Sequence, residues 1–153
     1  MDNPLTRVTH FVHQFDPSLT PIIMEEEMHT AEEAATAIGV ETAQIAKSIL
    51  FRSKDRYGLF VLAGDKRLPS AVVKQCLGGR KQKMATVEEV LAVTGFQIGA
   101  VCPFALREKI PIFIDTSLQR FHMFYTAAGV PESLLELTYD QLATMTKGTE
   151  IEL

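Results

Sequence analysis

The sequence predicts an α/β protein of the α+β kind, in which helices surround a mixed, curved β-sheet. Three observations favour this class. Strand-forming runs outnumber the regular strand–helix–strand units that build a parallel sheet. Helices with clear capping signals separate several of these runs. The 153 residues, 46% of them hydrophobic, are enough to bury one sizeable core. We therefore expect residues 1–153 to form a single domain.

The helices are predicted from apolar spacing and from the residues at their ends. Asn3 and Pro4 begin the first helix, because Asn accepts hydrogen bonds from free N–H groups and Pro has none to satisfy. Thr30 and Thr86 each precede a glutamate by three residues, the spacing of a capping box, and Thr138 precedes a glutamine in the same way. With their caps included, the predicted helices cover residues 4–15, 30–38, 41–46, 69–77, 86–95 and 138–146.

The strands are predicted from short β-prone runs that end at Gly, Pro or Asp. Residues 48–52 and 59–63 are joined by a turn that contains Gly58, so they are expected to form a hairpin. Two segments between elements are predicted to be loops, a basic one at residues 80–83 and an apolar one at residues 95–104. The expected strands cover residues 20–24, 48–52, 59–63, 110–115, 121–126, 134–137 and 149–153.

Composition excludes several classes of protein. No apolar run is long enough to span a bilayer, so no membrane partner is expected. The first residues are polar and acidic, unlike a secretory signal. Cys76 and Cys102 lie far apart and form neither a disulfide framework nor a metal motif. We therefore expect a cytoplasmic protein that needs no metal and no cofactor.

The net charge of −4 argues against a general nucleic-acid binder, but the charge is unevenly distributed. Residues 47–83 contain ten basic residues and two acids, whereas the rest of the chain contains five basic residues and seventeen acids. This asymmetry favours a local site for a polyanion on an otherwise acidic body. A solvated basic face without a ligand is the alternative.

Three features could carry chemistry. Lys47 lies in an apolar strand, where its ammonium must reach either a cleft or open solvent. The loop Gly99–Pro103 could present successive backbone N–H groups to an anion, or could be a plain tight turn. Cys102 could be a nucleophile if His29 or His122 lay beside it, but a free cysteine more often packs as a small hydrophobic residue.

Five motifs occur together in a characteristic order: Ile45-Ala46-Lys47-Ser48, Ala63-Gly64-Asp65, Lys83-Met84-Ala85 before Thr86–Val90, Thr94–Pro103 and Ile112–Asp115. In this order the chain resembles the YbaK and prolyl-tRNA synthetase-associated editing domain family, from about Thr30 to its end. The resemblance implies a barrel-like mixed sheet. It also implies a freestanding deacylase that hydrolyses an amino acid wrongly attached to tRNA, most often tRNA for proline.

The resemblance also implies site residues. The key lysine of the family falls on Lys47, and its glycine–proline loop falls on Gly99, Ala100, Val101, Cys102 and Pro103. Other members often begin this loop with two glycines and carry Ser before Pro, where this chain has Ala100 and Cys102. The residues expected to contact the substrate are Ser48, Asp65, Asp115 and His29, and those expected to bind tRNA are Arg80, Lys81 and Lys83.

The implied chemistry needs little from the protein. An aminoacyl ester is already reactive, so positioning and charge stabilisation suffice, with water as the nucleophile and help from a substrate ribose hydroxyl. The expected partners are aminoacyl-tRNA and prolyl-tRNA synthetase. The alternative function is a non-catalytic module that binds the tRNA acceptor end or a synthetase. Neither the amino acid removed nor the oligomeric state can be read from the sequence.

Overall fold

The structure, a computed structural model, describes residues 3–54 and 56–153. The predicted domain also includes residues 1 and 2, and the predicted hairpin turn includes residue 55; these three lie outside the described residues. Within the described part of the chain, no helix is long and apolar enough to cross a membrane.

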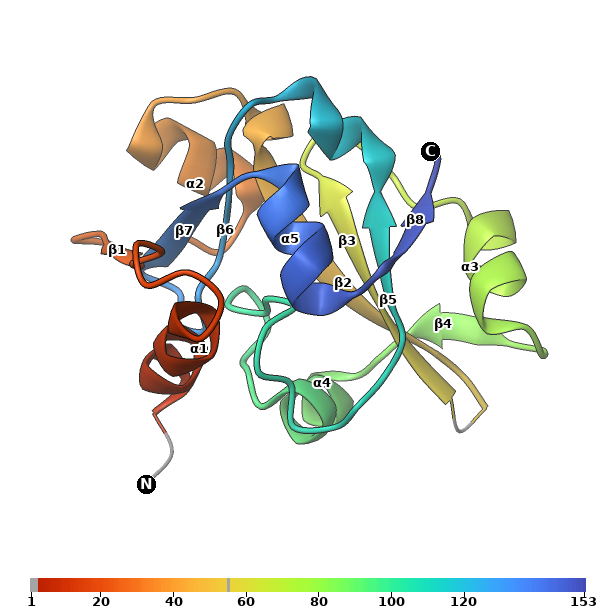
Figure 1. The fold of residues 1–153 in the computed structure, drawn as a ribbon. Helices are drawn as coiled ribbons and strands as arrows, with labels where there is room; N and C mark the ends of the chain where they lie inside the picture. Colours follow the sequence, from red (N-terminus) through yellow and green to blue (C-terminus); the bar gives the residue numbers. More distant parts are fainter. Residues whose placement is uncertain (1–2, 55) are drawn as a thin grey trace.

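Eight strands form one mixed sheet (Figure 1), which confirms the predicted fold class. The strand order is β1-β7-β6-β2-β3-β5-β8, and β4 pairs separately with β2. Parallel pairs join β2 to β6, β3 to β5 and β5 to β8, and the other pairs are antiparallel. The strands are β1 (Ile22–Ile23), β2 (Ile45–Ser53), β3 (Arg56–Ala63), β4 (Gln82–Met84), β5 (Ile112–Asp115), β6 (Phe124–Thr126), β7 (Ser133–Leu137) and β8 (Thr149–Ile151).

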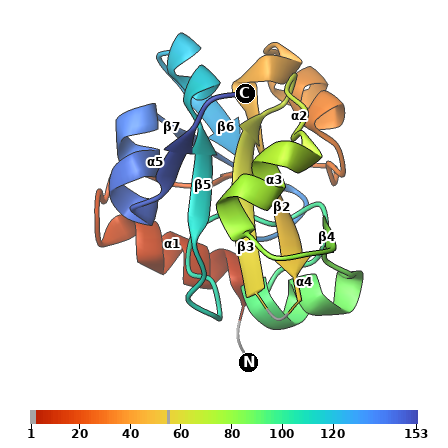
Figure 2. The same cartoon turned by 90° about the vertical axis from the view of Figure 1, so that its right-hand side faces the viewer.

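Helices cover both faces of the sheet, so the central strand β3 is almost continuously apolar. Val61 and Ala63 pack in one core cluster with residues of α1 (Pro4–His13) and α5 (Tyr139–Thr146). Phe60 and Leu62 point to the opposite face, where they pack against α3 (Ser70–Leu77). Figure 2 shows α1 and α5 on one side of β5 and α3 on the other.

Two more helices complete the layers. Ala34 and Ala35 of α2 (Ala31–Ile38) pack on Ile45 at the start of β2. Val90 and Val93 of α4 (Val87–Thr94) pack on the sheet at the far end of β2. Two 3₁₀ helices, η1 (Thr42–Gln44) and η2 (Thr116–Arg120), precede β2 and follow β5.

Several predicted boundaries are wrong, mainly because pairing between distant segments overrides local propensity. The helix expected over residues 41–46 is only the short η1, because Ile45 and Ala46 pair with β6. The basic loop includes β4, whose three residues pair with the end of β2. The first helix ends at His13, β1 has two residues, and β6 begins only at Phe124, because residues 121–123 bend between η2 and β6.

Two of the three predicted capping boxes are complete in the structure, and the third forms only one of its two hydrogen bonds. Thr86 and Thr138 each take part in a complete capping box. Thr30 accepts a hydrogen bond from the Glu33 N–H as expected. The Glu33 carboxylate, however, accepts from the N–H of His29 instead of from that of Thr30. This bond ties His29 to the first turn of α2.

Candidate active site

A gap in strand pairing along β2 creates the site. β3 pairs with β2 along its whole length, but on the other edge β6 reaches only Ile45–Ala46 and β4 only Phe51–Ser53. Leu50 O accepts from Ala85 N at this edge. Because backbone groups of alternate residues point to the same edge, the N–H and C=O of Ser48 point into the gap. They make no hydrogen bond among residues 3–54 and 56–153.

A cavity of about 110 Å³ lies at this gap. Residues at the start of α2, the middle of β2, the Gly99 loop and the segment before β7 line it. Its wall is largely apolar, with Met28, Ala34, Ile45 and Leu134 among its residues. Its polar contributors include His29, Lys47, Ser48 and the backbone at Gly99. Lys47 and the glycine loop, predicted from sequence to belong together, therefore share one cavity.

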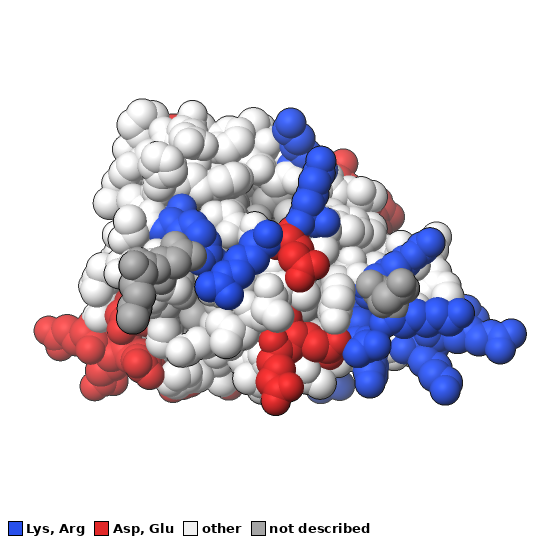
Figure 3. Space-filling model, turned by 90° about the horizontal axis from the view of Figure 1, so that it is seen from below, with Lys and Arg blue, Asp and Glu red and all other residues white. Residues whose placement is uncertain are grey.

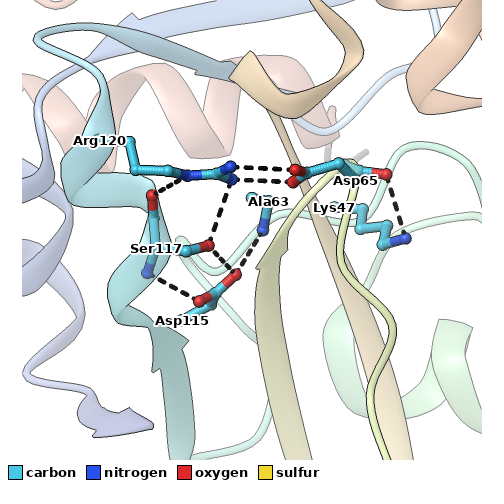
Figure 4. Close-up of polar contacts among 7 residues, drawn as sticks. Lys47, Ala63, Asp65, Asp115, Ser117 and Arg120 are labelled. Atoms are coloured by element: carbon cyan, nitrogen blue, oxygen red, sulfur yellow. Dashed lines mark hydrogen bonds and ion pairs between the residues drawn. The ribbon is translucent and has the colours of Figure 1, made fainter. Parts of the chain in front are cut away.

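Lys47 lies in the first half of β2, and its side chain is half-buried. Its Nζ donates to Gly64 O at 3.5 Å, a long hydrogen bond (Figure 4). Within the described residues this is its one acceptor, and an ammonium carries three N–H donors. Gly64 is held close to η1, since a Cβ there would collide with the Thr42 carbonyl. The ammonium is therefore placed by the backbone and keeps donors for a ligand.

Ser48 presents a buried hydroxyl next to Lys47. Its Oγ has no hydrogen-bond partner among the described residues. Buried hydroxyls are normally paired, so an unpaired one at a cavity wall is suited to meet a ligand atom. The Ser48 hydroxyl and its backbone groups together make this residue the most concentrated set of unpaired polar atoms at the gap.

The loop contributes only some of the residues expected of it. Gly99, with φ +92°, and Val101 line the cavity. Ala100 and Cys102 are fully buried, Pro103 is also buried, and none of the three lines the cavity. Ala100 N donates to Gln97 O at 3.0 Å, which closes a turn just before these residues.

Two loop N–H groups stay available. Those of Val101 and Cys102 have no acceptor within residues 3–54 and 56–153. The anion nest expected from sequence therefore excludes the Ala100 N–H, which the turn occupies. Of these two, only Val101 lines the cavity, so its N–H is the loop donor placed to stabilise a developing oxyanion there.

Cys102 does not have the surroundings of a nucleophile. Its side chain is fully buried in the main core, and burial raises the pKa of its thiol to about 12. The thiol is therefore protonated at neutral pH, whereas the reactive species is the thiolate. His29 lies at the cavity, and His122 lines a separate depression with Tyr139. Neither histidine reaches the sulfur.

Asp65 and Asp115 are not among the residues that line the cavity. Asp115 is fully buried, and its carboxylate accepts from Ala63 N at 3.1 Å and from Ser117 N and Oγ at 2.8 and 2.7 Å (Figure 4). Asp65 pairs through both oxygens with Arg120, which holds the pKa of that carboxyl below its usual value. Both carboxylates hold the end of β3, next to the Gly64 carbonyl that Lys47 contacts.

The predicted tRNA-binding residues lie at the other end of β2. Arg80, Lys81 and Lys83 are exposed. Figure 3 shows basic side chains gathered at one end of this face, over the β2–β3 hairpin and β4, with acidic side chains at the opposite end. Lys83 pairs in register with Arg52, which lies five residues from Lys47, or about 17 Å along the strand. The basic surface and the cavity are thus connected by one strand.

Sequence reasoning missed the apolar wall of the cavity and the contact between Lys47 and Gly64 O. Met28, Ala34 and Leu134 have ordinary core patterns, and no local signal separates a cavity wall from a core. Among the described residues, no three His, Cys, Asp or Glu side chains gather as metal ligands.

Comparison with known proteins identifies the family. The model of the aminoacyl-tRNA editing domain family matches residues 25–145. The "Uncharacterized protein YwhH" of Bacillus subtilis is 38% identical over 136 residues, which cover 88% of this chain and 85% of that protein. A solved structure described as a "putative trans-editing enzyme for prolyl tRNA synthetase" aligns with a TM-score of 0.91 at 30% identity, over 100% of this chain and 98% of that one.

A proline–tRNA ligase of Citrifermentans bemidjiense is 26% identical over 136 residues. They cover 89% of this chain but only 24% of the ligase, so the chain spans about a quarter of that relative. The family match extends over most of the chain and includes Lys47 and the Gly99 loop, as the motifs in the sequence predict. The chain therefore belongs to the aminoacyl-tRNA editing domain family.

Proposed function

We propose that this chain removes a wrongly attached amino acid from tRNA for proline by hydrolysing the aminoacyl ester in the cavity beside Lys47. One observation carries the proposal: Lys47, Ser48 with its unpaired hydroxyl, and Val101 with its free N–H line one cavity at the gap in the sheet. The activity class follows from the family, whose substrates are aminoacyl-tRNAs.

The geometry suits ester hydrolysis. Attack of water on the ester carbonyl creates negative charge on the carbonyl oxygen, and fixed donors near that oxygen lower the barrier. The Val101 N–H and the Lys47 ammonium are such donors. Lys47 is also able to hold the phosphate of the terminal nucleotide, and the hydroxyl and the N–H of Ser48 are able to donate to it.

The cavity favours a small, uncharged amino acid. Its volume is about 110 Å³, and the side chains of Met28, Ala34, Ile45 and Leu134 give it a largely apolar wall. A buried charged side chain would lose its hydration without a partner there. Alanine, cysteine, serine, threonine and small non-protein analogues meet this requirement.

The choice of tRNA rests on the comparisons. The proline–tRNA ligase is similar to this chain in sequence, and the structure described as a trans-editing enzyme for prolyl-tRNA synthetase is similar to it in sequence and fold. Prolyl-tRNA synthetase is accordingly the proposed source of the mischarged tRNA. The exposed Arg80, Lys81 and Lys83 are the proposed contacts for the phosphates of the acceptor stem.

The test is release of amino acid from a panel of tRNA(Pro) charged with alanine, cysteine, serine, threonine or proline. We expect hydrolysis of at least one small mischarged amino acid and protection of prolyl-tRNA(Pro). Tight binding of every ester without hydrolysis would instead support the non-catalytic module. Equal hydrolysis on an unrelated tRNA would remove tRNA for proline from the proposal.

A further inference from the structure

His29 lies at the mouth of the cavity with both ring nitrogens in defined surroundings. Its Nε2 is 3.1 Å from Oε1 of Glu27. Its Nδ1 faces Gly99, since a Cβ built on that glycine would lie 3.5 Å from Nδ1. When the ring is neutral with its proton on Nε2, that N–H is placed to donate to Glu27 Oε1 and Nδ1 carries the lone pair. The lone pair of Nδ1 is then directed towards the loop that lines the cavity.

Backbone contacts fix the position of His29 at the start of α2. The His29 N–H donates to Oε1 of Glu33 at 3.2 Å, and the next residue, Thr30, caps α2. The side chain itself is about half exposed, 56%, so it is open to water and to substrate. Glu27 is similarly exposed, at 58%. An exposed ring on a fixed backbone is able to approach a bound ester without rearrangement of the fold.

No other lining residue can accept a proton in the same way. Lys47 is the cavity's cation, and the Ser133 hydroxyl is already bonded to Val130 O and Ala128 N. Among the described residues that line the cavity, His29 alone carries an imidazole, the side chain that most often serves as a general base in enzymes. The remaining candidate base would be the substrate's own ribose hydroxyl.

We propose that His29, oriented by Glu27, is the general base of the deacylation, an inference that rests on the proposed function. Nδ1 takes a proton from water as the water oxygen bonds to the ester carbonyl carbon. The carbonyl oxygen becomes an oxyanion held by Lys47 and the Val101 N–H. When the ester C–O bond breaks, the proton on Nδ1 passes to the departing ribose oxygen. The products are the free amino acid and tRNA with an intact terminal hydroxyl.

The experiment compares single-turnover deacylation rates and tRNA affinities of His29→Gln and Glu27→Gln with those of wild type. Loss of a general base costs on the order of 10²–10⁴ in rate, so we expect His29→Gln to be at least about 100-fold slower. Because the water and not the tRNA is the partner of Nδ1, affinity for tRNA should change less than about twofold. Glu27→Gln, which only orients the ring, should lose about tenfold or less.

Matched controls separate this role from general effects. His122→Gln removes a histidine outside the cavity, and Glu26→Gln removes an exposed carboxylate next to Glu27; both should match wild type. His29→Gly leaves room for added imidazole, which should restore a saturable part of the rate. Imidazole with His122→Gln and without enzyme measures the direct reaction with the ester.

The results distinguish a failure of the His29 inference from a failure of the proposed function. If wild type releases no amino acid from any ester of the panel, both proposals fall. If wild type is active and His29→Gln keeps a third or more of its rate, or loses activity only through weaker tRNA binding, the ribose hydroxyl is the base and His29 is a substrate contact. Absence of imidazole rescue in a folded His29→Gly protein leads to the same conclusion.

Discussion

The backbone at Gly99 allows a sharp test of the loop, because two effects of a side chain there can be separated. Gly99 has φ +92°, a conformation that costs an L-residue about 1–2 kcal/mol. A Cβ would lie 3.5 and 3.7 Å from His29 Nδ1 and Cα, which is ordinary contact. Alanine is therefore strained but fits, whereas the two extra methyl groups of valine have to occupy the cavity mouth. We expect Gly99→Val to abolish deacylation in a folded protein.

Gly39 is the matched control. It ends α2 with φ +81°, and a Cβ there would meet nothing within 4 Å. Gly39→Val therefore introduces similar backbone strain away from the cavity. Both valine variants should lower the melting temperature by about 2–8 °C, from 1–2 kcal/mol in a protein of this size. Deacylation of one mischarged tRNA, measured beside thermal unfolding, should fall only in Gly99→Val. Equal activity of the two folded variants would show that the loop is a plain turn.

Three further predictions concern the core, the basic surface and a capping carboxylate. Cys102→Ser should keep most of the activity, and alkylating reagents should not inactivate the native protein, because the thiol is buried and its pKa is about 12; an inactive but folded variant would contradict this. Replacing Arg80, Lys81 and Lys83 together by alanine should lower the slope of log affinity against log salt by about 0.7–0.9 for each phosphate that the variant no longer neutralises, whereas an unchanged slope places tRNA elsewhere. The Thr86 N–H and the Tyr57 hydroxyl lower the pKa of Glu89 to about 2, so its contribution to stability, on the order of 2 kcal/mol, is present above about pH 4.5 and is lost as the pH falls towards 2. The stability difference between wild type and Glu89→Gln, measured by urea unfolding, should therefore shrink on acidification, and a constant difference would refute it.

The sequence predicts the elements better than it predicts their limits. Caps at Asn3, Thr86 and Thr138 are local signals, and the structure places helix starts at all three. The start of β2 at Ile45 is set by pairing with β6, some 80 residues later in the chain, and no window around Ile45 contains that information. The same holds for β4, whose basic residues look like a loop until they are placed against Ser53.

The residues of the candidate site also differ in how far their role can be predicted from the sequence. Lys47 and Gly99 could be predicted because family motifs mark them, and they meet at one cavity. Asp65 and Asp115 carry equally recognisable motifs, but their carboxylates serve the end of β3, through Arg120 and through Ser117. A motif shows that a residue matters without showing whether the ligand or the fold depends on it, and only the three-dimensional partners decide between the two.

The most direct test of the account is the deacylation rate of Lys47→Ala on a mischarged tRNA(Pro), compared with Lys109→Ala, an exposed lysine outside the cavity. Loss of one donor to a developing oxyanion costs on the order of 10²–10³ in rate. We therefore predict a loss of that size for Lys47→Ala and none for Lys109→Ala, with both variants folded by circular dichroism. A Lys47→Ala protein that hydrolyses the ester at the wild-type rate would contradict the central claim that this cavity is the deacylation site.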